Sequence, residues 1–119
     1  MPISWGRAEK VTFSNCGALD QWVAEPTPAV YAVTYQKDPL NKPKSHTVLF
    51  FGESEDLAQQ QTTIKHQVCD AWNREGGHSN ELFVFVCPMK GSTKQQRIKL
   101  QQQLVLEYQP RANVYAEDY

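Results

Sequence analysis

The sequence predicts a small α/β fold of the α+β kind, in which helices flank a three-stranded mixed sheet that contains a β-hairpin. The chain has 119 residues, which is enough for one domain. Short segments rich in β-branched and aromatic residues are interleaved with longer segments whose apolar residues recur at helical spacing. We expect residues 1–28 to form an N-terminal lead-in and residues 29–119 to form the main domain.

The lead-in has a mixed character. Trp5, Val11 and Phe13 favour a short strand, and residues 18–24 favour a brief helix that ends before Pro26. These patterns leave open whether the lead-in covers a cleft or extends the sheet.

Two strands and a loop follow. Residues 29–35 and 47–51 are β-branched and aromatic, while residues 38–45 between them contain Pro39 and Pro43. We therefore expect an antiparallel hairpin with a mobile, lysine-bearing tip.

The first long helix is expected after Gly52. Ser54 is a suitable N-cap, and Glu55 and Asp56 after it suit the positive end of a helix dipole. Gly76 and the glycine after it would end the helix. Its apolar side chains form one stripe: Leu57, Ile64, Val68 and Trp72.

A third strand and a second helix complete the domain. Residues 81–87 are almost continuously apolar, which predicts a central strand closed by Pro88. Ser92 and Gln95 have the spacing of a capping box, so we expect a helix from there to about Tyr108. One stripe of this helix contains Ile98, Gln101, Val105 and Tyr108.

Gln101 is a polar residue on this otherwise apolar stripe. A buried amide without a partner costs about 1–3 kcal/mol, so Gln101 should either bond to a neighbour or lie at the edge of a cleft. A boundary glutamine that reaches solvent is the simpler interpretation.

Composition and charge exclude several classes of protein. The chain has 12 basic and 13 acidic residues, so its net charge of −1 creates no overall field for a polyanion. No apolar run is long enough for a membrane span, and the first residues do not resemble a signal peptide. We expect a cytoplasmic protein with no membrane partner.

The cysteines and histidines show no metal-binding spacing. The cysteines are odd in number and far apart, which favours free, buried thiols in a reducing compartment over disulfides. No pair has the spacing that seeds a zinc site, so we expect none. The residues concerned are Cys16, Cys69, Cys87, His46, His66 and His78.

Four segments, taken together, resemble the GIY-YIG nuclease family. They are Pro-Ala-Val-Tyr at 28–31, Phe-Phe-Gly at 50–52, Glu-Ser-Glu-Asp-Leu at 53–57, and Leu-Val-Leu-Glu-Tyr-Gln-Pro-Arg-Ala-Asn at 104–113. The last segment is most similar to the N-terminal nuclease domain of the excision-repair endonucleases. Because the four lie in the family's order on the expected elements, the resemblance is fairly specific.

The resemblance implies phosphodiester hydrolysis by a tyrosine or a tyrosine-activated water, with an arginine on the phosphate and a helix glutamate on one divalent metal. In this chain the first tyrosine is Tyr31, whereas the second is Phe50. Gln60 stands at the arginine position, and Gln101 stands at the metal-binding glutamate. His66 lies on the first helix, where many relatives carry a histidine.

These replacements imply a degenerate site. An uncharged amide is a poor ligand for a hard cation, and losing one transition-state donor typically lowers the rate ~10²–10³-fold. We therefore expect no metal cofactor, with Mg²⁺ or Mn²⁺ only if the domain is active. In a rebuilt site the substitutes would be Lys65 or Arg74 for the arginine, and Glu53, Glu81 or Glu107 for the carboxylate.

Basic residues gather in the last third of the chain. Phosphate contact and a solvated helix face explain them equally well. These residues are Lys90, Lys94, Arg97, Lys99 and Arg111.

Three functions follow from these observations. The preferred one is a catalytically degenerate GIY-YIG-like domain that binds DNA, RNA or a protein partner. The alternatives are an active metal-dependent endonuclease with a rebuilt site, and a protein-interaction or small-molecule domain.

Overall fold

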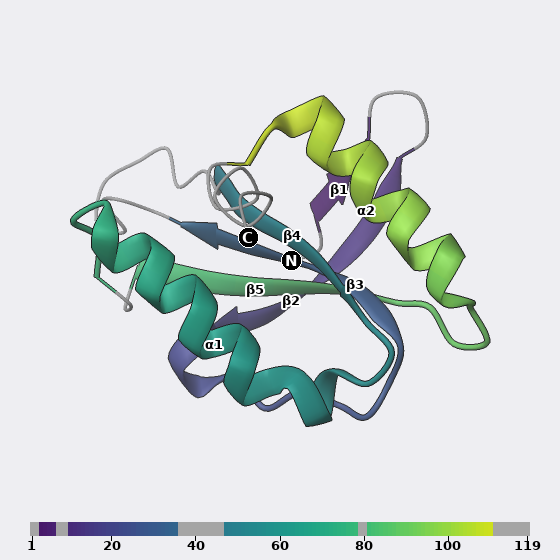
Figure 1. The fold of residues 1–119 in the computed structure, drawn as a ribbon, viewed down its shortest axis with the longest axis horizontal. Helices are drawn as coiled ribbons and strands as arrows, with labels where there is room; N and C mark the ends of the chain where they lie inside the picture. Colours follow the sequence, from purple (N-terminus) through teal and green to yellow (C-terminus); the bar gives the residue numbers. More distant parts are fainter. Residues whose placement is uncertain (1–2, 7–9, 36–46, 79–80, 111–119) are drawn as a thin grey trace.

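The computed structural model describes residues 3–6, 10–35, 47–78 and 81–110 (Figure 1). The expected hairpin tip at 38–45 lies outside the described residues, as do His46 and Arg111.

The described strands form one antiparallel sheet (Figure 1). Along the chain the elements are β1 (Ile3–Trp5), β2 (Val11–Ala18), the short 3-10 helix η1 (Leu19–Gln21), β3 (Ala29–Tyr35), β4 (Thr47–Ser54), α1 (Leu57–Arg74), β5 (Leu82–Pro88) and α2 (Lys94–Tyr108). The strand order is β1-β2-β5-β3-β4, and neighbouring strands run antiparallel throughout. The α+β class is confirmed, as are the hairpin of β3 and β4 and the central place of β5.

The prediction of a three-stranded mixed sheet is wrong, because the lead-in supplies two more strands. β2 pairs with β5 through Ser14 and Val86, and β1 pairs with β2. The expected helix at 18–24 is a single 3-10 turn. The lead-in therefore extends the sheet.

The two helices cover opposite faces of the sheet, since alternate residues of β3 and β5 pack in two different cores, one with α1 and one with α2. Under α1 lies a core that includes Tyr31, Val33 and Leu82, together with Leu19 and Trp22 from the lead-in. The predicted α1 stripe is confirmed, since Leu57, Ile64, Val68 and Trp72 are all buried.

The second core lies under α2. Trp5 makes edge-on contacts with Phe13, Phe51 and Phe85 at centroid distances of 5.1, 5.7 and 5.5 Å. Burying aromatic rings in this way stabilises the junction of β1 with the sheet. The lead-in thus contributes side chains to both cores.

The start of α1 differs from the sequence-based expectation. Asp56, rather than Ser54, caps α1 by accepting from the backbone N–H groups of Ala58 and Gln59. Ser54 instead accepts from the Asp56 N–H, which holds the turn before the helix.

The start and the buried stripe of α2 also differ. The capping box of α2 is made by Thr93 and Gln96, one residue later than predicted. The fully buried residues of α2 are Arg97 and Leu104, whereas Ile98 is half-buried.

Candidate functional site

Tyr31 is buried in the core beneath α1. Its ring lies directly over Gly52, its cross-strand partner on β4, where a Cβ atom would collide with the ring. Burial, and secondly the Glu53 carboxylate, raise the pKa of the Tyr31 hydroxyl above its ordinary value. The phenol is therefore neutral at physiological pH and poorly suited to act as a nucleophile.

Phe50 lies beside Tyr31, with a ring-centroid distance of 6.0 Å. The register places Phe50 opposite Val33 and Val48 opposite Thr34, so Leu49 is an extra residue, a β-bulge. The bulge turns both Leu49 and Phe50 toward the α1 face. The structure thus brings Tyr31 and Phe50 together, as one ring contact without a second hydroxyl.

Gln101, on α2, forms a hydrogen bond with β4, the last strand of the described sheet, from the face opposite α1. Its Nε2 donates to the Phe51 carbonyl oxygen at 2.9 Å. The Phe51 ring packs in the core under α2, whereas Tyr31 packs in the core under α1. Gln101 is therefore a half-buried amide with a backbone partner, and it belongs to a different core from Tyr31.

Gln60 and Gln61 have different roles on α1. Gln60, at the expected arginine position, is exposed. Gln61 accepts from the Ala24 N–H at 2.6 Å and donates to the Trp22 carbonyl at 2.8 Å. Gln61 therefore holds the lead-in against α1.

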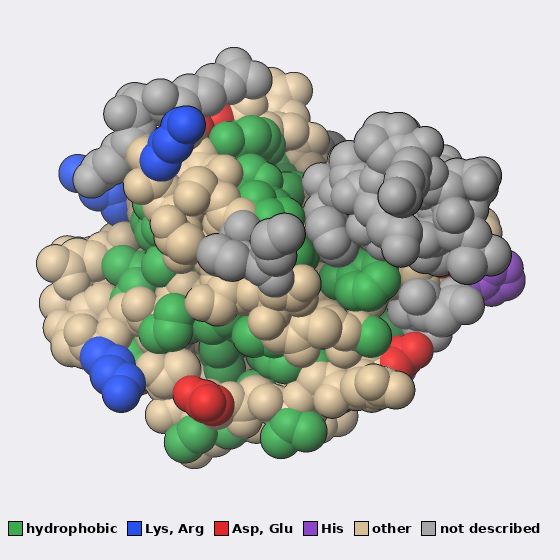
Figure 2. Space-filling model, turned by 180° about the vertical axis from the view of Figure 1, so that it is seen from behind, with side chains coloured by type: hydrophobic (Ala, Val, Ile, Leu, Met, Phe, Trp, Pro, Cys, Tyr) green, Lys and Arg blue, Asp and Glu red, His purple; other side chains and the backbone are tan. Residues whose placement is uncertain are grey.

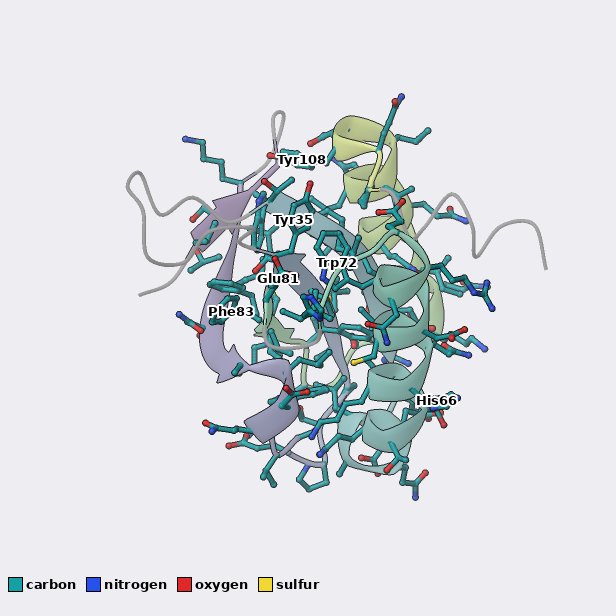
Figure 3. The ribbon with its side chains drawn as sticks, turned by 90° about the vertical axis from the view of Figure 1, so that its left-hand side faces the viewer. Tyr35, His66, Trp72, Glu81, Phe83 and Tyr108 are labelled. Atoms are coloured by element: carbon teal, nitrogen blue, oxygen red, sulfur yellow. The ribbon has the colours of Figure 1, made fainter. Side chains whose placement is uncertain are left out.

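His66 lies on the outer side of α1 and points away from the sheet (Figure 3). Tyr31, by contrast, is covered by the helix. The structure does not bring His66 and Tyr31 together.

Arg97 and Glu53 form a buried ion pair between α2 and β4. Arg97 Nε donates to Glu53 Oε2 at 3.1 Å, and the side chains are 2% and 16% exposed. Arg97 Nη1 also donates to the carbonyl and the hydroxyl of Ser92, at 3.0 and 2.9 Å. Arg97 is therefore occupied inside the protein and does not present a cation to a surface ligand.

Apart from Lys65, the groups expected as substitutes have other partners. Arg74 pairs with Asp70 at 2.8 Å near the exposed end of α1, while Lys65 is half-buried on that helix. Glu81 accepts from the His78 N–H at 2.7 Å, and Glu107 lies 3.5 Å from Gln103 Nε2.

The residues at the expected metal position do not fit a divalent cation. Gln101 offers only a neutral amide, and that amide is bonded to the Phe51 carbonyl. The nearby carboxylate of Glu53, two residues after Phe51 on β4, is neutralised by Arg97. In the described parts of the chain, no three His, Cys, Asp or Glu residues lie close enough to hold a metal ion.

The cysteines only partly match the expectation of buried thiols. Cys69 and Cys87 are half-buried, but Cys16 is exposed and lies in a run of exposed residues from Ser14 to Gly17 on β2. No described helix is long and apolar enough to cross a membrane.

The basic region is more dispersed than its sequence suggests. Lys90, Lys94 and Lys99 are exposed. Lys94 and Lys99 lie five residues apart on α2, about 140° around the helix, so they do not point in one direction. In Figure 2, Lys and Arg side chains lie at the upper left and, separately from these, at the lower left of the view.

No protein-family model, no curated protein and no solved structure matches this chain.

Two structural residues were missed at the sequence level. Arg97 lies one helical turn before Gln101, and residues 97, 101, 104 and 108 recur at helical spacing, so this stripe could have been recognised. The role of Gln61 could not have been recognised from the sequence, because its backbone partners Ala24 and Trp22 lie in the lead-in, 37 and 39 residues earlier.

Proposed function

We propose that this chain is a non-catalytic domain of the GIY-YIG type that binds nucleic acid. The observation that carries the proposal is the state of Gln101. The residue at the position of the family's metal ligand is an uncharged amide, and it bonds to the backbone of Phe51.

Three further features support the loss of catalysis. Tyr31 is buried with a raised pKa, Phe50 has no hydroxyl, and Gln60 has no charge. A phosphoryl-transfer transition state needs cationic groups around its spread negative charge. The cation of Arg97, which lies one turn before Gln101 on α2, is already paired with Glu53.

The exposed lysines support nucleic acid as the ligand. Lys90, Lys94 and Lys99 lie on α2 and on the turn that precedes it, and none forms an ion pair with a described acidic residue. Lysine contacts with phosphates supply most of the sequence-independent affinity for DNA and RNA. Because Lys94 and Lys99 lie about 140° apart around α2, the proposed contact is weak and non-specific.

Fluorescence polarisation with labelled single-stranded, duplex and branched DNA tests the proposal. We expect binding that weakens with salt, with a log–log slope of at most about −2.7 for duplex if all three lysines contact phosphates. The triple variant Lys90→Ala, Lys94→Ala, Lys99→Ala should lose most of this binding. Lys65→Ala, on the other helix, is the matched control and should bind as the unaltered protein does.

Binding that is unchanged in the triple variant would refute the lysine surface. No binding to any of these probes at low salt would refute DNA as the ligand and would favour a protein partner.

A further inference from the structure

The side of α2 that faces away from the sheet carries a straight row of exposed side chains, which we call the outer stripe. Its members are Gln95, Lys99, Gln102 and Leu106, and their spacing places them within about 60° of one another around the helix. All four are exposed, and Leu106 is 76% exposed. The outer stripe lies opposite the fully buried residues of α2, and the helix itself forms an outer layer of the fold (Figure 1).

The charges on α2 suit a polyanion that surrounds the helix. The carboxylate on α2 belongs to Glu107, which is half-buried and lies about 100° around the helix from Leu106. Lys99 belongs to the outer stripe, whereas Lys94 lies on a flank of the helix and Lys90 in the turn before it. Cations spread around one helix can reach phosphates on more than one side of it, as the two walls of a groove require.

The size and chemistry of the outer stripe match the major groove of B-form DNA. A helix with its side chains is about 10–12 Å wide, and this groove is about 12 Å wide. The stripe extends about 16 Å along the helix axis, at about 1.5 Å per residue. Glutamine amides donate to and accept from base edges, lysine binds guanine or phosphate, and an apolar side chain contacts the thymine methyl group.

We propose that α2 docks in the major groove of duplex DNA, with the outer stripe against the base edges and Lys94 at the phosphates of one groove wall. This inference rests on the proposed function and narrows its ligand to B-form duplex DNA. A single strand has no groove, and the major groove of A-form RNA is too deep and narrow for side chains to read.

Fluorescence polarisation at low salt with three labelled probes of one sequence tests the proposal. The probes are a DNA duplex, the corresponding DNA single strand and an RNA duplex. We expect the DNA duplex to bind at least about tenfold more tightly than the RNA duplex, because only the DNA groove admits the helix. Binding of the RNA duplex or of the single strand that equals binding of the DNA duplex would overturn the proposal.

Gln102→Glu places a carboxylate in the middle of the outer stripe. We expect it to weaken binding of the DNA duplex about fivefold, the effect of one like charge about 4 Å from a phosphate in water. Gln67→Glu, at an exposed position on α1, makes the same change in net charge and is the matched control. It should bind almost as the unaltered protein does. Gln95→Glu is a second variant of the stripe and should weaken binding as Gln102→Glu does.

The outcomes separate this inference from the proposed function. Equal effects of Gln102→Glu and Gln67→Glu would overturn the inference, since they would show a response to net charge alone. The inference also fails, while the proposed function stands, if both stripe variants bind normally and the triple lysine variant does not bind. If no probe binds to the unaltered protein, both fail.

Discussion

Arg97 Nε lies 3.1 Å from Glu53 Oε2, and this ion pair joins α2 to the edge strand β4 in the interior of the protein. The same guanidinium donates to the Ser92 carbonyl and hydroxyl, so it also secures the turn before α2. Charges that are removed from water need such partners, because a buried charge without one is strongly destabilising.

Removal of one partner of this pair should therefore be costly. We expect Arg97→Met to lower the free energy of unfolding by about 3 kcal/mol, because it leaves the Glu53 carboxylate without its partner. Denaturant unfolding measures the change. The double variant Arg97→Met, Glu53→Gln should recover much of the loss.

The exposed pair on α1 provides the control for this measurement. Arg74 and Asp70 are 63% and 55% exposed, so Arg74→Met should change stability by about 0.5 kcal/mol or less. Equal losses for Arg97→Met and Arg74→Met would contradict a buried, energetically coupled pair.

Gly52 is required by the ring of Tyr31. A Cβ atom at position 52 would collide with the ring of Tyr31, which is enclosed in the core and cannot move away. We expect Gly52→Ala to destabilise the protein by about 1–3 kcal/mol, as overpacking of a core does. In a Tyr31→Leu background the same substitution should cost much less, and thermodynamic additivity of the two substitutions would exclude the contact.

The raised pKa of Tyr31 predicts a loss of stability at alkaline pH. Above the unfolded-state value of about 10, the unfolded chain releases the phenolic proton while the folded chain keeps it. The free energy of unfolding should then fall with rising pH by up to about 1.4 kcal/mol per pH unit from this group. Tyr31→Phe should remove this contribution, and an unchanged pH slope in that variant would show that Tyr31 titrates normally.

Gln61 connects the lead-in to α1 through two backbone hydrogen bonds. Gln61→Leu leaves the Ala24 N–H and the Trp22 carbonyl without these partners, so we expect a loss of about 1–3 kcal/mol. Gln60→Leu, at the adjacent exposed position, should have almost no effect. Thermal or denaturant unfolding of the two variants separates the roles, and similar stabilities would refute the connection.

The elements with strong local signals could be predicted from the sequence. The stripe from Leu57 to Trp72 and the apolar segment of β5 were correctly recognised, because their periodicity reflects burial. The strands of the lead-in were harder to place, since β2 alternates only weakly and its pairing with β5 spans about 70 residues along the chain. Such pairings have no local signal.

In the candidate site, too, the sequence predicts which element carries each residue but does not predict the contacts between distant segments. The positions of Tyr31, Phe50 and Gln101 on their elements follow from sequence spacing, but their partners do not. The expected α2 stripe through Ile98 did not include Arg97, because charged residues are usually exposed. Arg97 is buried because the fold places its partner Glu53 beside it.

The most direct test of the central claim is a cleavage assay on the purified protein. Single-stranded, duplex and branched DNA would be incubated with Mg²⁺ or Mn²⁺, with Tyr31→Phe as the matched variant. Because Gln101, at the proposed metal position, is an uncharged amide that bonds to Phe51, we expect the protein to cleave none of these substrates faster than Tyr31→Phe does. Metal-dependent cleavage that is lost in Tyr31→Phe would contradict the account, because it would show a working site that uses the buried tyrosine.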